Sequence, residues 1–501
     1  MFNAPAHTPP SWDEFRDVTP RKAAAMILYR GESPCEVLMV RRSDNLTFMG
    51  GHHAFPGGGI DPQDAITPVR HAQTQEQGAA LAAAVRELFE ETGVLYAEGA
   101  ETVPIESVAE ARAALDKAAM NFADFLNAHG LWIDARRFVP AGRWITPPFS
   151  PIRFDSQYFL ALAPPNAAPS PLPGDTEIVA TEWMEPQTAR RRWHRGEIKL
   201  STPVAFILQQ LARFRPDEAA PWLQRTPCLR EGFAQRYELR CGITLIPVRV
   251  HTLPPATHTT CVVVGDRDLY VIDPGCQDTE EQELLLEHLE DMIRRGAHIR
   301  GILLTHTHPD HIGAVELLRA RYGAPVSAHT AAQDALPFSL DQTVEDGARL
   351  TLAGSDSWSI QCLHTPGHDP AHLCFYEETT RTLCCGDLVA NPGTIVISPE
   401  HKGNMKEYMA GLERILEIPF TLLVPSHGLP LSQREGHEKI KEYLQHRLRR
   451  EEQIRTAWET GCRTEDALLE QVYQDTPREK WPIARLQLHA HIQALGLTLE
   501  N

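Results

Sequence analysis

A cluster of histidine and aspartate side chains directly follows a short apolar segment of the chain. Residues 301–313 have the sequence GILLTHTHPDHIG, in which residues 302–304 are apolar. The side chains of ligand type that come next are His306, His308, Asp310 and His311. Side chains at i and i+2 of an extended segment point to the same side, and the turn that follows can bring the next two towards them. Three imidazoles and a carboxylate so close together are costly to bury without a ligand, but they suit zinc. The spacing therefore favours a metal site over a merely hydrophilic loop.

Three later segments place further ligand-type side chains at the ends of apolar stretches. His368 lies in TPGHDPAH, Asp387 in LCCGDLV and His427 in LVPSHG. Each segment alone is a weak signal, because a single histidine after a strand is more often structural than a ligand. Their occurrence in this order after the histidine cluster is what predicts a common centre.

Together these segments resemble the metallo-β-lactamase superfamily over residues 241–430. The resemblance implies a four-layer αββα sandwich with two zinc ions and a catalytic role for Asp310. It implies a first zinc site of His306, His308 and His368, a second of Asp310, His311 and His427, and Asp387 as the bridge between them. Asp273, in VIDPG, matches an acidic residue that stabilises the loop carrying the ligands.

The resemblance also implies a reaction. Paired cations lower the pKa of a shared water towards neutrality and stabilise the oxyanion that develops when it attacks a carbonyl or phosphoryl centre. Asp310 would orient this nucleophile as well as bind metal. The nearby His364, His372 and His401 are expected to be structural or solvent-facing.

A second group of acidic residues lies near the N-terminus, after a glycine-rich loop. The loop is AFPGGGID, residues 54–61, and the acidic segment is RELFEETGV, residues 86–94. On a helix Glu87, Glu90 and Glu91 share one face. Three like charges repel one another unless a cation or an arginine offsets them, which favours Mg²⁺ or Mn²⁺ over a simply acidic exposed face.

This second group resembles the Nudix box, G-x5-E-x7-R-E-U-x-E-E-x-G-U, where U is a bulky apolar residue. The matching residues are Arg86, Glu87, Leu88, Glu90, Glu91, Gly93 and Val94. The first half departs from the pattern, because Gly78 stands where a glutamate is expected and extra residues separate Gly59 from Arg86. Over residues 20–215 the chain is similar to the coenzyme A diphosphatase branch. The resemblance implies an α/β/α sandwich in which the glutamates bind Mg²⁺ or Mn²⁺, Glu90 and Glu91 act in catalysis, and Arg86 holds the loop. The departure leaves open an active enzyme or a domain that only binds a ligand.

Alternating strands and helices must position both groups. Residues 23–29 and 36–41 predict strands and residues 79–92 a helix; residues 260–265 and 269–272 predict strands and residues 280–295 a helix. The fold class is therefore α/β and multidomain. The expected parts are a tail (1–20), a Nudix-like domain (21–215), a linker (216–240), a metallo-β-lactamase domain (241–430) and a helical, winged-helix-like C-terminal region (431–501).

Composition narrows the range of functions. The chain has 501 residues, of which 42% are hydrophobic and 23% charged, the balance of an ordinary globular protein. A net charge of -18 disfavours a non-specific nucleic-acid coat, although a metal-centred nuclease stays possible. The ten cysteines are too few for a disulfide scaffold. With no signal peptide or membrane span expected, the sequence predicts a cytoplasmic protein that acts on small molecules, with no membrane partner and an open oligomeric state.

These features predict a dinuclear zinc hydrolase acting on an ester, thioester or phosphoester, fused to a Nudix-type diphosphate hydrolase. An acyl-coenzyme A contains both a thioester and a diphosphate, so coenzyme A-type thioesters are the favoured substrate class. The C-terminal segment KEYLQHRLRREEQI resembles the tail of the lactamase-beta-like-2 branch, which includes thioesterases and an endoribonuclease. The alternative is thus a zinc-dependent endoribonuclease whose Nudix domain only binds a nucleotide.

Overall fold

The computed structural model divides the chain into two compact units, Phe15–Cys241 and Gly242–Asn501. The structure describes residues 18–46, 49–147, 150, 152–165, 167–225, 229–230, 233–354 and 357–500. Most of the predicted N-terminal tail, residues 1–17, and parts of the predicted linker lie outside these residues. Strands and helices alternate in both units, so the α/β multidomain class is confirmed. None of the helices in the described parts combines the length and apolar character that a membrane span requires.

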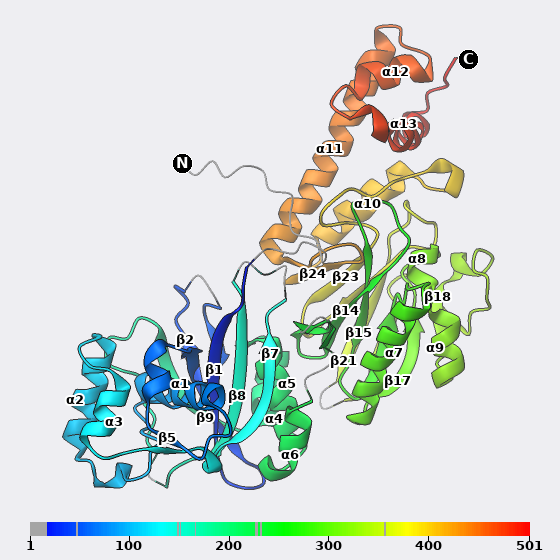
Figure 1. Ribbon diagram of the computed structural model, residues 1–501. Helices are drawn as coiled ribbons and strands as arrows, with labels where there is room; N and C mark the ends of the chain where they lie inside the picture. The colour runs from blue at the N-terminus through cyan, green and yellow to red at the C-terminus, as the bar shows by residue number, and fades with distance from the viewer. Residues whose placement is uncertain are drawn as a thin grey trace. The chain divides into compact units, whose positions relative to one another are not determined.

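The N-terminal unit is a mixed sheet with helices on both faces (Figure 1). Alternate residues of its central strand β1 (Arg21–Arg30) point to opposite faces. Met26 and Leu28 pack in one apolar core with helix α1, and Ala25 and Ile27 pack in another with helices α4 to α6. This two-sided burial is the α/β/α sandwich that the sequence predicts.

The sheet has the strand order β10-β3-β2-β1-β8-β7, with β4 paired to β1 and β9 to β2. Besides β1, the strands of this unit are β2 (Glu36–Arg42), β3 (His52–Ala54), β4 (Gly57–Gly59), β5 (Val69–Arg70), β6 (Ile133–Asp134), β7 (Val139–Ile145), β8 (Phe154–Leu162), β9 (Ile178–Met184), β10 (Lys199–Leu200), β11 (Leu229–Arg230), β12 (Phe233–Ala234) and β13 (Tyr237–Arg240). Its α-helices are α1 (Gln75–Thr92), α2 (Ile105–Asp116), α3 (Phe122–Ala128), α4 (Pro186–His194), α5 (Thr202–Leu211) and α6 (Pro216–Leu223). The last of these, α6, lies in the segment predicted as a linker and packs in the same core as α4 and α5.

Helix α1 carries the acidic group, and its ends are set by local chemistry. The Thr74 side chain accepts a hydrogen bond from the backbone N–H of Gln77 and caps the N-terminus. Gly93 ends the helix in the left-handed region, with φ of 76°, and its N–H donates to the carbonyl of Phe89. The apolar face of α1 is buried against the sheet, so the acidic residues are held at a fixed distance from the glycine loop.

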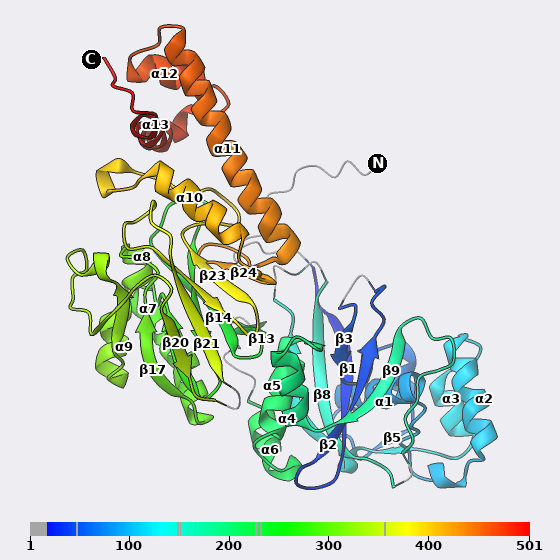
Figure 2. The same cartoon turned by 180° about the vertical axis from the view of Figure 1, so that it is seen from behind.

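The C-terminal unit contains two sheets, each with helices on its outer face (Figures 1 and 2). Helices α7 and α9 share an apolar core with the first sheet, and α10 and α11 share one with the second. Val262 and Val264 of β15 point away from the first core and are also buried. Both faces of this sheet are therefore covered, as the predicted αββα arrangement requires.

Within the C-terminal unit, the strands of the first sheet follow in the order β14 to β19 and those of the second in the order β20 to β25. The strands are β14 (Ile243–Arg249), β15 (His258–Val264), β16 (Asp268–Ile272), β17 (His298–Leu303), β18 (Val326–His329), β19 (Gln342–Val344), β20 (Arg349–Leu352), β21 (Trp358–His364), β22 (Leu373–Glu377), β23 (Thr382–Gly386), β24 (Leu422–Pro425) and β25 (Leu431–Ser432). The α-helices are α7 (Thr279–Arg294), α8 (Pro309–Ile312), α9 (Val315–Tyr322), α10 (Met405–Leu416), α11 (Gln433–Glu459), α12 (Glu465–Val472) and α13 (Trp481–Leu495).

The C-terminal region is helical, in agreement with the sequence. Helix α11 begins at a capping box in which Ser432 and Glu435 each accept a backbone N–H of the other. It then runs from the second sheet to α12 and α13 (Figure 2). There it forms a small apolar core of its own with those helices, which includes Ile454, Leu469 and Leu488.

Candidate metal centres

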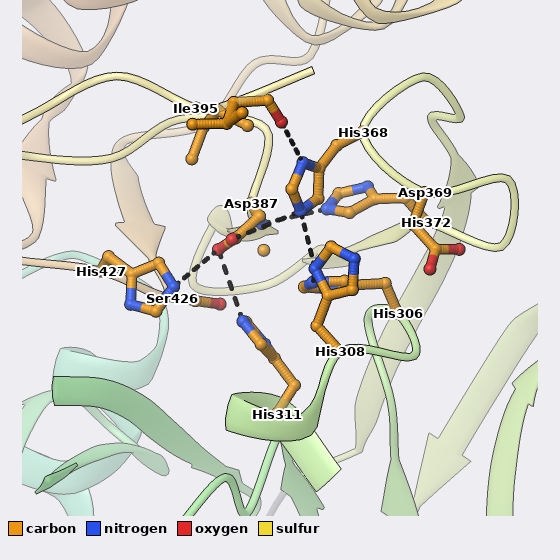
Figure 3. A network of polar contacts seen from close by, with 12 residues as sticks. His306, His308, His311, His368, Asp369, His372, Asp387, Ile395, Ser426 and His427 are labelled. Atoms are coloured by element: carbon orange, nitrogen blue, oxygen red, sulfur yellow. Dashed lines mark hydrogen bonds and ion pairs between the residues drawn. The ribbon is translucent and has the colours of Figure 1, made fainter. Parts of the chain in front are cut away.

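The structure brings the seven ligand-type residues of the C-terminal unit together where strands of its two sheets end (Figure 3). Each comes from a segment that directly follows or connects strands: the β17–α8 loop and α8 itself, the β21–β22 loop, and the ends of β23 and β24. The residues are His306, His308, Asp310, His311, His368, Asp387 and His427. The buried strands fix where each loop starts, and so the side chains converge although they are far apart in sequence.

His306, His308 and His368 form the first close-set group. Nε2 of His306 and Nε2 of His368 each lie 3.0 Å from Nδ1 of His308. A tetrahedral zinc ion with ligands about 2.1 Å away keeps those ligands roughly 3.4 Å apart. The three nitrogens are thus spaced as ligands of one ion would be.

Asp387 lies between this group and a second one. Its Oδ2 is 3.6 Å from Nε2 of His368, and its Oδ1 is 3.5 Å from Nε2 of His311 and 3.3 Å from Nε2 of His427. Asp310 approaches the second group from the other side, with Oδ2 3.5 Å from Nε2 of His427. One carboxylate therefore faces both groups, one oxygen towards each.

Two buried atoms of this cluster support a cation. Nε2 of His311 and Oδ1 of Asp387 are fully buried, yet neither has a hydrogen-bond partner among the described residues. Such atoms cost free energy when they are left unsatisfied. They face one another across the second group, where a metal ion would satisfy both, so the donor set fits zinc.

Four of the imidazoles are oriented through their other ring nitrogen. Nδ1 of His306 lies 3.0 Å from the Thr305 hydroxyl, and Nδ1 of His311 lies 2.9 Å from the Asp273 carboxylate. Nδ1 of His368 and of His427 face the backbone carbonyls of Val396 and His258, each at 2.9 Å. Partners of this kind fix the tautomer, so that Nε2 faces the centre with its lone pair.

The pKa shifts follow from burial and from the three aspartates. Burial, with help from the neighbouring imidazoles, lowers the pKa of His306 well below its usual value. Burial also opposes a charge on His311, but Asp273, Asp387 and Asp310 overcome it and raise its pKa to about 10. Burial disfavours ionised Asp387, yet the charges of His427 and His311 hold its pKa well below the ordinary range. The Asp387 carboxylate is therefore ionised and attracts positive charge, as a metal site requires.

Asp273 is not one of the proposed ligands, but its carboxylate binds the segments that carry them. It is 1% exposed and accepts hydrogen bonds from the backbone N–H and the hydroxyl of Thr305, at 2.8 and 2.6 Å, besides its contact with His311. The Ser426 hydroxyl lies 3.4 Å from the same carboxylate. Asp273 thus joins the segments that carry three of the ligands.

Some residues that support the centre carry no recognisable signal in the sequence. His372 is fully buried, and its Nε2 accepts a hydrogen bond of 3.0 Å from the backbone N–H of Asp387. Asp369 accepts a hydrogen bond of 2.5 Å from the Thr307 hydroxyl and so ties the β21–β22 loop to the histidine cluster. His364 stacks on His329, with ring centroids 3.8 Å apart. Only the folded chain shows these pairings, because the partners are distant in sequence.

In the N-terminal unit, Arg86 organises the acidic face of α1. Its Nη1 donates to Glu87 and to Glu90, each at 2.9 Å. Its Nε and Nη2 donate to the two oxygens of Asp64, at 3.0 and 3.1 Å, and Nη2 also donates to the Gly59 carbonyl. These bonds use all five N–H groups of the guanidinium, so Arg86 joins the glycine loop to the glutamates.

Glu91 is buried, Glu87 and Glu90 are partly buried, and the three carboxylates are crowded. Burial raises the pKa of Glu87 to about 7 and that of Glu91 well above its usual value, and the charges of neighbouring glutamates add to both effects. A Cβ on Gly58 would lie 2.3 Å from the Glu87 carboxylate, so any other residue at this loop position would displace that carboxylate. Oxygen ligands around such a cluster suit Mg²⁺ or Mn²⁺. However, the close-set groups of three ligand atoms in the described chain all belong to the histidine centre, and the glutamates do not form one.

Both regions are similar to known protein families. The family description "Metallo-beta-lactamase superfamily" matches residues 254–427, and "NUDIX domain" matches residues 19–121. A beta-lactamase-like protein 2 homolog from Drosophila melanogaster is 30% identical over 251 residues, which are 48% of this chain and 82% of that protein. An atrochrysone carboxyl ACP thioesterase from Cryptosporiopsis sp. is 30% identical over 206 residues, 40% of this chain and 58% of that protein. Among solved structures, a NUDIX hydrolase from Alicyclobacillus acidocaldarius is 30% identical and covers 42% of this chain and 97% of its own, with a TM-score of 0.37.

Replacing Asp273 by asparagine should loosen the strands that carry the ligands. The substitution removes the charge that faces His311 and leaves a donor where Thr305 needs an acceptor, which costs about 3 kcal/mol for a buried pair. Hydrogen exchange of the β16 and β17 amides, measured on the full chain in the presence of a chelator, should become faster. The matched control is Asp278→Asn, because Asp278 is 59% exposed in its pair with His251 and should change stability by about 1 kcal/mol or less. Unchanged protection in Asp273→Asn would contradict this account.

Proposed function

Because the chain belongs to the metallo-β-lactamase superfamily and carries a Nudix domain before that region, we propose that it is a hydrolase with two active sites. The histidine centre would hold two zinc ions and cleave a thioester. The Nudix carboxylates would hold Mg²⁺ or Mn²⁺ and cleave a diphosphate. The position of Asp387, with one oxygen towards each histidine group, is the observation that carries the proposal of a paired centre.

In the zinc centre each residue would have a distinct role. The first ion would be held by His306, His308 and His368, the second by Asp310, His311 and His427, with Asp387 between them. When bound, the two ions would lower the pKa of a water and stabilise negative charge on the attacked oxygen. Asp310 would accept a hydrogen bond from this water and orient it towards the thioester carbonyl carbon. The new C–O bond then replaces the C–S bond, and the thiol leaves with the proton.

The proposed substrate class contains both of the bonds that the two domains would cleave. Several relatives of the hydrolase region are named as thioesterases that act on an acyl carrier protein. An acyl-coenzyme A offers a thioester to one site and a diphosphate to the other. We therefore propose coenzyme A-type thioesters as the substrates. The described cysteines are all free thiols, which supports our proposal of a reducing compartment such as the cytoplasm.

We further propose that the Nudix site is active although its box lacks one glutamate. Asp64 is inaccessible to solvent and binds Arg86 through both oxygens. It would hold the arginine so that Glu87 and Glu90 point away from the helix towards the glycine loop. Glu87, Glu90 and Glu91 would then bind Mg²⁺ or Mn²⁺, which offsets their charge and that of the substrate phosphates. Water attacks one phosphorus and the P–O–P bond breaks.

The zinc centre is tested by thiol release from a panel of acyl-coenzyme A thioesters. With zinc bound, the purified chain should release free thiol, and His306→Ala should lower both the bound zinc and the rate. The loss should exceed about a hundredfold, because metal ions contribute several kcal/mol to transition-state stabilisation. Full zinc together with full turnover in His306→Ala would refute the assignment. Cleavage of RNA without any thioester activity would instead support the alternative of an endoribonuclease.

The Nudix site is tested separately by Glu90→Gln. The wild-type chain should release 3′,5′-ADP from coenzyme A in the presence of Mg²⁺, and Glu90→Gln should lose this activity because a neutral amide binds Mg²⁺ poorly. Thiol release should be unchanged in the same variant, just as 3′,5′-ADP release should be unchanged in His306→Ala. If coenzyme A, NADH and ADP-ribose are all left intact by the wild type, the domain is a binding module.

The role of Asp64 is tested by Asp64→Asn. Loss of the buried carboxylate removes one acceptor of Arg86, so the glutamates become less well placed and Mn²⁺ affinity should fall by about tenfold or more. Asp61→Asn is the matched control: Asp61 lies in the same short segment and 3.8 Å from Arg86, but its side chain is 56% exposed. Titration with Mn²⁺ alone measures both variants. Equal affinities in Asp64→Asn and the wild type would exclude this role.

A further inference from the structure

The loop that follows Asp387 contacts His368 of the zinc centre at Nδ1, the ring nitrogen that does not face the other ligands. Residues 388–398 lie between β23 and the short helical turn Pro399–His401. Within this loop, the carbonyl of Val396 accepts a hydrogen bond of 2.9 Å from Nδ1 of His368. The direction of Nε2 of His368, which faces His308 and Asp387, thus depends on where this carbonyl lies (Figure 3).

Side chains from the C-terminal helices hold the same loop. Arg447 of α11 donates through Nη2 to the Ile395 carbonyl at 2.6 Å and to the Thr394 hydroxyl at 3.1 Å. Gln487 of α13 donates through Nε2 to the same Ile395 carbonyl at 3.0 Å. The peptide next to the Val396 carbonyl is therefore fixed by two donors from outside the sheets.

Arg447 and Gln487 also bind one another. Nη1 of Arg447 donates to Oε1 of Gln487 at 3.0 Å, so one amide accepts from the guanidinium and donates to the loop. Nearer the start of the loop, the Tyr443 hydroxyl donates to the Gly393 carbonyl at 2.8 Å. Arg447 and Gln487 are thus joined to each other, and all three side chains hold the loop from α11 and α13.

Burying these polar side chains costs free energy. Arg447 is 2% exposed and Gln487 is 6% exposed. In the described chain, the hydrogen-bond acceptors of Arg447 are carbonyl, amide and hydroxyl oxygens rather than carboxylates. A buried guanidinium without a counter-ion is unfavourable, and an apolar side chain of similar length would pack there at less cost. What the guanidinium adds is a set of fixed donors.

We propose that Arg447 and Gln487 are positioning residues of the zinc centre. They hold the Ile395 peptide, and with it the Val396 carbonyl that orients His368. The C-terminal helices are then a part of the hydrolase site, and they act on it through the loop. This inference rests on the zinc centre proposed above.

The test compares zinc affinity between variants of the full chain. Arg447→Met and Gln487→Met keep most of the side-chain volume and remove the donors to the loop. Groups that orient a metal ligand typically change metal affinity by about 10–100-fold. Competition with a chromogenic chelator should show a loss of about tenfold or more in Arg447→Met and a smaller loss in Gln487→Met. Arg447→Lys, which keeps one charged donor, should restore part of it.

Arg450→Met is the matched control. Arg450 lies on the next turn of α11, is 5% exposed and donates to Asp475 at 3.1 Å and to the Val472 carbonyl. Among the described residues it makes no hydrogen bond to the loop. Its loss weakens the C-terminal core while leaving the loop in place, so zinc affinity should stay within about twofold. Equal losses in Arg450→Met and Arg447→Met would mean that general loosening of the helices, and not the loop contact, sets the affinity, and would overturn the proposal.

Two measurements separate the possible failures. Circular dichroism of each metal-free variant shows whether it is folded, and Gln487→Met, the milder change, serves if Arg447→Met is not. A wild type that binds no zinc would contradict the proposed function itself. A wild type that binds zinc, with folded variants that bind it equally well, would contradict only the positioning role.

Discussion

The histidine centre depends on one buried carboxylate, that of Asp273. It follows β16 and has a positive φ of 49°, which turns the chain under the ligand loops. Its oxygens accept from the backbone and side chain of Thr305 and from His311, while Ser426 lies close by. Hydrogen bonds to an ionised acceptor are stronger than neutral ones. The segments leading to His306, His311 and His427 are thereby fixed relative to each other before any ion binds.

The seven ligand-type residues were predictable because the signal is local. His306 to His311 are close in sequence, and the other residues follow apolar strands, so strand ends alone suggest a common edge. Asp64 and Arg447 were not predictable in this way. Each acts through a partner far along the chain, Arg86 for one and Ile395 for the other, and no spacing in the sequence marks such a pair. The layers of both units follow from strand and helix periodicity, whereas the buried polar contacts follow from packing.

The incomplete Nudix box is a further case in which a contact between separate segments is not visible in the sequence pattern. The segment between the glycine loop and α1 contains a short helical turn, Pro62–Ile66, which presents Asp64 to Arg86. A Cβ at Gly78 would be in ordinary van der Waals contact with Ala72 and Val69, at 3.5 and 4.0 Å. This segment therefore places apolar groups beside the position that the pattern gives to a glutamate, and it brings a carboxylate to Arg86 from elsewhere in the chain. The departure from the sequence pattern therefore does not by itself mean that the site is lost.

The two centres also differ in the ions that they favour, which bears on how one chain would use both. Five imidazoles and two carboxylates suit zinc, whereas the glutamates of α1 offer only oxygen, which suits Mg²⁺ or Mn²⁺. Each centre is supported by a buried polar group from a distant segment, Asp273 in one and Asp64 in the other. Under the proposed substrate class, a molecule that carries both a thioester and a diphosphate offers the zinc centre the C–S bond and the Nudix centre the P–O–P bond.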